Sequence, residues 1–95
     1  MPTVEEVVQA AFDEAGLEPL AWSCPANAAY AVHDHPAAKL IFCTQGLITF
    51  TLHQDGKLRE LTLKPGDRLD LPAQTGHSAV AGPEGVTCWE AFRGS

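Results

Sequence analysis

The sequence predicts an all-β sandwich or barrel that carries one short N-terminal helix. After residue 16, short apolar or alternating runs follow one another closely, with turn residues between them. Turns such as Asp55-Gly56 suit antiparallel hairpins better than the long crossovers of parallel βαβ units. The expected strands are 40–44, 47–53, 58–64, 68–71, 77–81 and 86–92, and residues 20–32 are expected to add one or two weaker strands.

The start of the chain holds the only strong helical pattern. Thr3 and Glu6 have the spacing of a capping box, and Gly16 is of the residue type that commonly ends a helix. The apolar residues at helical spacing are Val4, Val7, Val8, Ala11, Phe12 and Ala15. A helix this short is marginal alone, so its apolar stripe should dock on the β domain. With no linker or internal repeat, we expect a single domain, in which residues 1–16 form a helix packed outside a β domain of residues 17–95.

Composition excludes several classes of partner. The 95 residues carry a net charge of −6, so a basic face large enough for nucleic acid or an anionic membrane is not expected. No apolar run approaches the ~20 residues that span a bilayer, and the acidic N-terminus does not resemble a signal peptide. The cysteines Cys24, Cys43 and Cys88 are odd in number and form no CxxC pair. We therefore expect a reduced, cytoplasmic protein whose cysteines are small core residues.

Three of the four histidines are placed as metal ligands would be. His33 and His35 are two residues apart, so on a strand both imidazoles leave the same face with Cβ atoms about 7 Å apart. Both can then reach one ion at about 2.1 Å. A third ligand must come from another strand, and His77, which follows a loop and opens an apolar run, is suited to supply it. His53 stands just before a turn and is expected to be exposed and without a role.

These histidines lie in two stretches with a characteristic spacing. The first has the spacing of the pattern G-x5-H-x-H-x(3,4)-E-x6-G, and the second has the spacing of G-x5-P-x-G-x2-H-x3-N. The positions are Asn27, His33, His35, Lys39 and Gly46 in the first stretch, and Gly66, Pro72, Gln74, His77 and Ala81 in the second. With both spacings kept, residues 20–92 resemble the small single-domain cupins. The resemblance implies a cupin jelly-roll β-barrel in which His33, His35 and His77 hold one divalent transition metal, such as Zn, Fe, Ni or Mn.

Lys39 is the departure that bears on chemistry, because the cupin motif has a metal-binding Glu at this position. An ammonium group close to a metal ion would repel it. The metal can sit on the three histidines alone, with Lys39 turned away or neutral. A neutral Lys39 would be a candidate catalytic base or nucleophile. Alternatively, the site is metal-free and the ammonium fills its place. Asn27 in place of Gly is a mild change, since Asn tolerates left-handed backbone.

The resemblance and the ligand set predict binding of a small, anionic molecule. Three neutral imidazoles leave open positions on the ion and leave its full double charge uncompensated, which favours an anionic ligand. The chain would then be a metal-dependent oxygenase, isomerase or lyase. The alternatives are a sensing or binding module without turnover, and a metal-free barrel in which Lys39 holds an anion. By analogy with small barrels of this kind, we expect a homodimer.

The remaining residues of interest have structural interpretations. Cys43 shares strand parity with Lys39 and would therefore face the cavity. Cys88 and Trp89 lie on opposite faces of the last strand, so only one of them can line the barrel. Tyr30 has opposite parity to His33 unless a bulge intervenes, and it is not counted as a ligand. The aromatic residues expected in the core or in a subunit interface are Trp22, Trp89, Phe42, Phe50 and Phe92.

Overall fold

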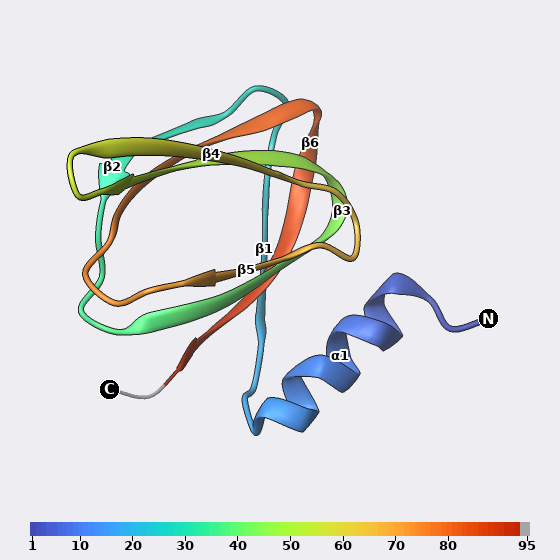
Figure 1. Ribbon diagram of the computed structural model, residues 1–95. Coiled ribbons are helices and arrows are strands. Elements are labelled where there is room, and N and C mark those ends of the chain that lie inside the picture. The colour runs from blue at the N-terminus through green and yellow to red at the C-terminus, as the bar shows by residue number, and fades with distance from the viewer. Residues whose placement is uncertain (94–95) are drawn as a thin grey trace.

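A computed structural model describes residues 1–93 and confirms the all-β prediction (Figure 1). One helix is followed by six strands. The helix α1 spans Val4–Ala15, and the strands are β1 (Leu20–Cys24), β2 (Ala29–His33), β3 (Ala38–Gln54), β4 (Lys57–Leu63), β5 (Arg68–Leu71) and β6 (Gly76–Arg93). No helix within residues 1–93 is long and apolar enough to cross a membrane.

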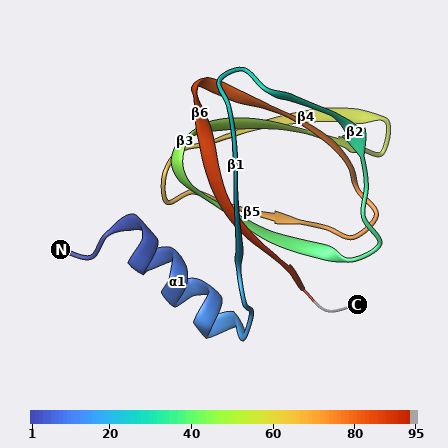
Figure 2. The same cartoon turned by 180° about the vertical axis from the view of Figure 1, so that it is seen from behind.

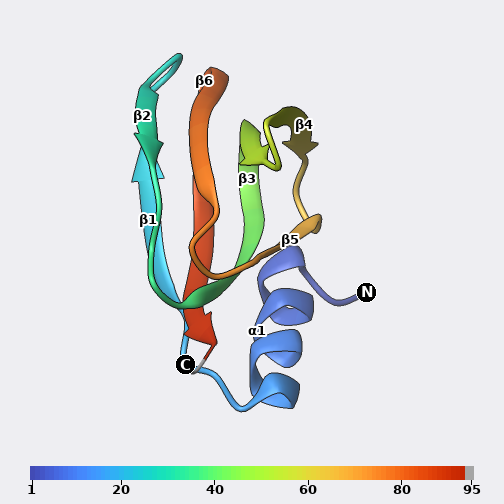
Figure 3. The same ribbon diagram turned by 60° about the vertical axis from the view of Figure 1, so that its left-hand side comes forward.

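The strands form one antiparallel sheet that curls into a shell around β3 and β6, which pair along most of their length. At one end of this pair, β1 lies beside β6 and β5 lies beside β3. At the other end, β2 lies beside β6 and β4 lies beside β3. Figure 3 shows β6 running between the β1–β2 side and β3. The two ends of the β3–β6 pair thus carry different outer strands, and together the strands enclose the interior.

One prediction about the strands is wrong. Separate strands were expected at 40–44 and 47–53, and at 77–81 and 86–92. Each pair is one long strand that bends at an irregularity, and the β3–β6 register shifts between Cys43 and Gln45 and again between Gly46 and Ile48. Gly46 has a φ of 77°, and a Cβ there would collide with the backbone oxygen of Gly85 on the neighbouring strand. Glycine at position 46 therefore permits a bulge and a close backbone approach within one strand, and not the predicted turn between two strands.

The helix packs outside the shell, as predicted (Figure 2). Its capping box is formed by Thr3 and Glu6, and Gly16 ends it with a φ of 71°. Because side chains alternate along β3, Leu40 and Phe42 face outward and bury Val8 and Phe12 of α1. The Phe12 and Phe42 ring centroids are 5.6 Å apart.

The expected apolar stripe of the helix is wider than the face that it buries. Val7 is half exposed and Ala15 is exposed, whereas Val8 and Phe12 are fully buried. The contact therefore runs along one narrow edge of the helix.

The side chains of β3 and β6 that alternate with the outward-facing ones point into the interior of the shell. Ile41 and Cys43 belong to the inner core, as does Cys88, whereas Trp89 packs toward the helix. Cys24 joins Cys43 and Cys88 in this core, which confirms the expectation that the cysteines are buried. Burial raises the pKa of the Cys43 and Cys88 thiols, so both stay protonated near neutral pH.

Candidate metal centre

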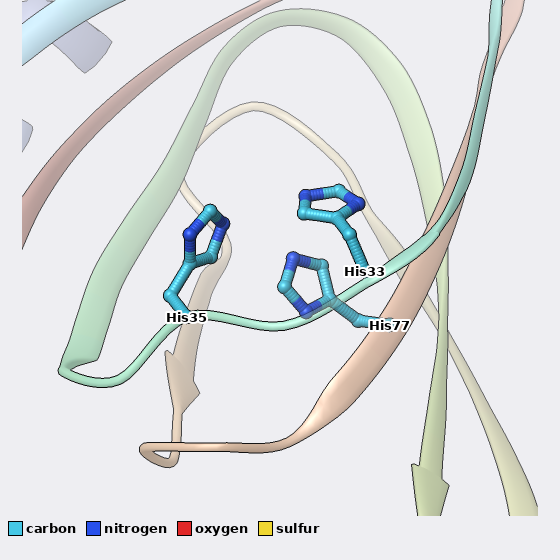
Figure 4. Close-up of side chains that lie close together, drawn as sticks. All are labelled: His33, His35 and His77. Carbon is cyan, nitrogen blue, oxygen red and sulfur yellow. The ribbon is translucent and has the colours of Figure 1, made fainter.

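His33, His35 and His77 come together inside the shell (Figure 4). His33 ends β2 and lies opposite His77 of β6, while His35 lies in the bend that leads into β3. Each ring has a nitrogen within 4.8 Å of one on the other two. The ring centroids are 4.3 Å apart for His33 and His77, 5.0 Å for His33 and His35, and 5.4 Å for His35 and His77.

The backbone around the cluster explains how His35 reaches it. The expectation that His33 and His35 share one strand face is wrong, because β2 ends at His33. The carbonyl of His35 instead accepts a 2.7 Å hydrogen bond from the backbone N–H of Gln74, in the loop before His77. The bend that carries His35 is thus hydrogen-bonded to the loop that precedes His77.

Hydrogen bonds to the backbone select the nitrogen that the rings of His33 and His77 present. The Nδ1 atom of His33 is 2.8 Å from the carbonyl oxygen of Ala31, and Nδ1 of His77 is 2.9 Å from that of Thr75. A carbonyl can only accept, so each Nδ1 carries the proton and Nε2 keeps a free lone pair. Nε2 of His35 is buried with no hydrogen-bond partner among the described residues. This pattern, in which one ring nitrogen is fixed and the other is left for an ion, fits metal ligation.

Burial also keeps His35 and His77 in the form that binds metal. It lowers the pKa of His35, and the positive charge of Lys39 lowers it further. Burial lowers the pKa of His77 as well, against the opposing effect of its bond to Thr75. Because metal ligation requires neutral imidazole, both side chains are available near neutral pH.

A cavity of about 250 Å³ opens beside the cluster. It is lined by Trp22, Tyr30, His33, Lys39, Ile41, Phe50, His77, Ala79 and Glu90. The wall is thus mostly apolar, with two charged residues. His77 is buried, whereas His33 is exposed, so the cluster is accessible from one side. A larger hollow of about 550 Å³ surrounds Gly46 and Gly85, but no histidine lines it.

Lys39 faces this cavity, paired with an acid that the sequence analysis missed. Its Nζ lies 2.7 Å from Oε2 of Glu90 on β6, and their side chains are only 11% and 21% exposed. Oε1 of Glu90 accepts a 2.8 Å hydrogen bond from Nε1 of Trp22. Glu90 shares strand parity with Cys88 and is an acid in an otherwise apolar run, which is the signal that could have indicated it.

Several other residues differ from the sequence expectations. A register shift between Tyr30 and His33 places both on the cavity wall, despite their opposite parity in a regular strand. Cys43 is fully buried in the inner core and does not line the cavity. Phe92, expected in the core or in a subunit interface, is 52% exposed, and its ring lies 5.8 Å from that of His35. His53 is exposed, as expected.

Solved structures of known proteins are similar to this chain in fold. No protein-family model matches the chain. A variant of oxalate decarboxylase from Bacillus subtilis superposes with a TM-score of 0.74 at 22% identity, over 81% of this chain and 21% of that one. A DMSP lyase structure also has a TM-score of 0.74 at 22% identity, over 83% of this chain and 39% of that one. The chain has the cupin fold.

A curated relative gives a partial sequence match to this chain. Acireductone dioxygenase from Alcanivorax borkumensis is 38% identical over 52 residues, which are 55% of this chain and 29% of that protein. The chain thus spans well under half the length of the proteins that it matches. Another similar structure was determined in work on the Mn(II) centres of Bacillus subtilis oxalate decarboxylase.

The cupin motif positions have the backbone geometry that their usual residues would supply. Gly46 and Gly66 have positive φ angles of 77° and 93°. Asn27 and Gln74, which stand where the motif has glycine, also have positive φ angles, of 60° and 56°. Asn adopts this region readily, whereas Gln74 does so at a cost in strain. The turns of the motif are therefore kept although two of its glycines are absent.

Proposed function

We propose that this chain is a metal-binding cupin in which His33, His35 and His77 hold one divalent transition metal ion. The observation that carries the proposal is the buried Nε2 of His35, which has no hydrogen-bond partner among the described residues and lies beside two rings with Nε2 free. A buried polar atom without a partner is costly, and an ion would satisfy it. Three imidazoles suit Zn, Fe or Ni, and the Mn(II) of oxalate decarboxylase adds Mn to the candidates.

The charges around the cavity favour a small anionic ligand. The three imidazoles are neutral ligands, and Lys39 and Glu90 offset each other, so the ion's double charge is left uncompensated. A volume of about 250 Å³ lies below the range usual for drug-sized ligands, so the ligand is small. When bound, the ion would polarise an oxygen of such a ligand. Oxalate, in the name of one structural neighbour, is an anion of this kind.

The proposed chemistry is that of a metal-dependent oxygenase, isomerase or lyase. The neighbours are named as a decarboxylase, a lyase and a dioxygenase, which supports an enzyme over a sensing module without turnover. The metal-free alternative, with Lys39 holding an anion, loses support because the ammonium is paired with Glu90. Oxygen consumption with a panel of small carboxylates and diketones separates the oxygenase from the sensing module.

Metal content measured by mass spectrometry on untagged protein tests the proposal. We expect about one ion per chain in the wild type, and loss of that ion in His35→Gln and in His77→Gln, because each change removes one imidazole. His53→Gln, at an exposed position, is the matched control and should keep the ion. Circular dichroism verifies that each variant is folded. A wild type without metal, or unchanged metal in both site variants, refutes the proposed function.

A further inference from the structure

The Lys39–Glu90 pair is an unusual feature for the wall of a mostly apolar cavity. Trp22, Ile41 and Phe50 line the same space. Removing two charges from water is expensive, and replacing a buried ion pair by apolar residues is often neutral or stabilising. Stability alone therefore does not account for this pair, and its position in the cavity wall indicates contact with the ligand.

The pair lines the cavity and keeps unused hydrogen-bonding capacity. An ammonium has three N–H donors, and among the described residues Lys39 gives one to Glu90 and lies 5.0 Å from the centre of the Phe92 ring. Each oxygen of Glu90 accepts one hydrogen bond, from Lys39 or from Trp22, and each retains a further lone pair. A donor and an acceptor therefore stand side by side.

The pair is also close enough to the histidines to act on a ligand held there. His33 and His77 line the same cavity as the pair. One small molecule can therefore reach the histidine cluster and the ion pair together.

We propose that Lys39 and Glu90 determine specificity by selecting small carboxylates that carry a hydroxyl group next to the acid, that is, 2-hydroxy acids. A hydroxyl is both donor and acceptor, so it can donate to Glu90 and accept from Lys39 at once. The carboxylate of the same molecule faces the histidine site, and its apolar body lies against Trp22 and Phe50. An acid without the hydroxyl leaves the pair desolvated and unsatisfied. This inference rests on the proposed metal-dependent binding of an anion.

The test compares mandelate with phenylacetate, which differ by this hydroxyl alone, on protein loaded with Zn²⁺. Dissociation constants are measured by calorimetry for each enantiomer of mandelate, and lactate with propionate form a smaller pair. We expect one mandelate enantiomer to bind at least about tenfold more tightly than phenylacetate, a difference of about 1.4 kcal/mol. That size lies at the lower end of the range for a hydrogen bond to a charged group.

The double variant Lys39→Met with Glu90→Gln removes both charges together, because a single change would bury an unpaired charge. The amide oxygen of Gln can still accept from Trp22. We expect this variant to bind Zn²⁺ and to bind the hydroxylated and plain acids equally. Lys57→Met, at an exposed lysine of β4, is the control and should keep the preference.

The outcomes separate the two proposals. Failure of the wild type to bind Zn²⁺ refutes the proposed function itself. If Zn²⁺ binds, equal affinities for the paired acids, no measurable binding of any of these acids, or a preference that persists in the double variant overturns the role of Lys39 and Glu90. The wild-type comparison needs no variant, so an unstable double variant leaves the question decidable.

Discussion

Reversing the charge of Lys39 should destabilise the metal-free protein and strengthen its metal binding. In Lys39→Glu, a 2.7 Å ion pair between largely buried groups becomes two facing carboxylates. At an effective dielectric constant of 20, two unit charges 4 Å apart interact by about 4 kcal/mol. Breaking a buried pair typically costs about 3–5 kcal/mol, and we expect a loss of that size in the free energy of unfolding. This is a large part of the ~5–15 kcal/mol that stabilises a typical domain.

The same substitution places a carboxylate where the cupin motif has its metal-binding Glu. It removes an ammonium and adds an anionic group near three neutral imidazoles, and both changes favour a divalent cation. We expect Zn²⁺ to bind at least about tenfold more tightly than to the wild type, a gain of about 1.4 kcal/mol. Because an ion that binds only the folded state stabilises it, Zn²⁺ should restore much of the lost stability, by about 2.7 kcal/mol at one hundred times the dissociation constant.

Urea denaturation followed by tryptophan fluorescence measures both effects, once with a chelator and once with Zn²⁺. Lys57→Glu is the matched control, because it makes the same charge change at an exposed lysine of β4. If Lys39→Glu without metal loses no more stability than Lys57→Glu, the ion pair does not have the energetic weight assigned to it. If Zn²⁺ stabilises Lys39→Glu no more than the wild type, position 39 does not act on the metal site.

Other buried groups give two more predictions. Phe12→Ala should cost about 3–5 kcal/mol in urea denaturation, because Phe12 is fully buried against Phe42, and it should leave the metal content unchanged, since α1 packs outside the shell. The lowered pKa values of His35 and His77 imply that the unfolded chain takes up protons at higher pH than the folded apoprotein. The stability of the apoprotein should therefore be highest above the usual histidine pKa of 6.5 and should fall as the pH drops below it. His77→Gln should flatten this slope, whereas a slope unchanged in His77→Gln would contradict the assignment.

Local features of the chain were predicted well where local chemistry decides them. The ends of α1 follow from Thr3, Glu6 and Gly16, whose interactions stay within a few residues. The extent of the buried helix face was not predictable in the same way. Val7 has the correct spacing, yet it is half exposed because the width of the contact depends on the sheet opposite. Periodicity identifies a candidate face, and tertiary packing decides how much of it is covered.

The long strands show a second limit of local signals. Gly46 is equally suited to a turn between two strands and to a bulge within one strand. The difference lies in pairing with β6, where Gly85 approaches so closely that no side chain fits at position 46. Because that partner is nearly forty residues away, the sequence near Gly46 does not distinguish the two structures.

The histidine cluster was predictable because two spaced motifs identified it, whereas Glu90 has no motif. Glu90 reaches Lys39 only through the register of β3 against β6, in which Ile41 lies opposite Glu90. Strand parity gives the side of the sheet on which a side chain lies, but not the residue that it meets on the next strand. The sequence thus showed the main departure from the cupin motif, at Lys39, but it did not show that Glu90 neutralises the charge of Lys39.

The pairing of Lys39 with Glu90 also determines the electrostatics of the proposed site. A lone ammonium at position 39 would face the three histidines and oppose a cation among them, while a lone carboxylate at position 90 would compete with an anionic ligand for that cation. Together, at 2.7 Å, the two charges largely offset each other at the ion and still present a donor and an acceptor to the cavity. Under the proposed function, the metal would supply the attraction for an anion, and the pair would supply the choice among anions. Affinity and specificity would then be separable, and each could be changed by substitution without removing the other.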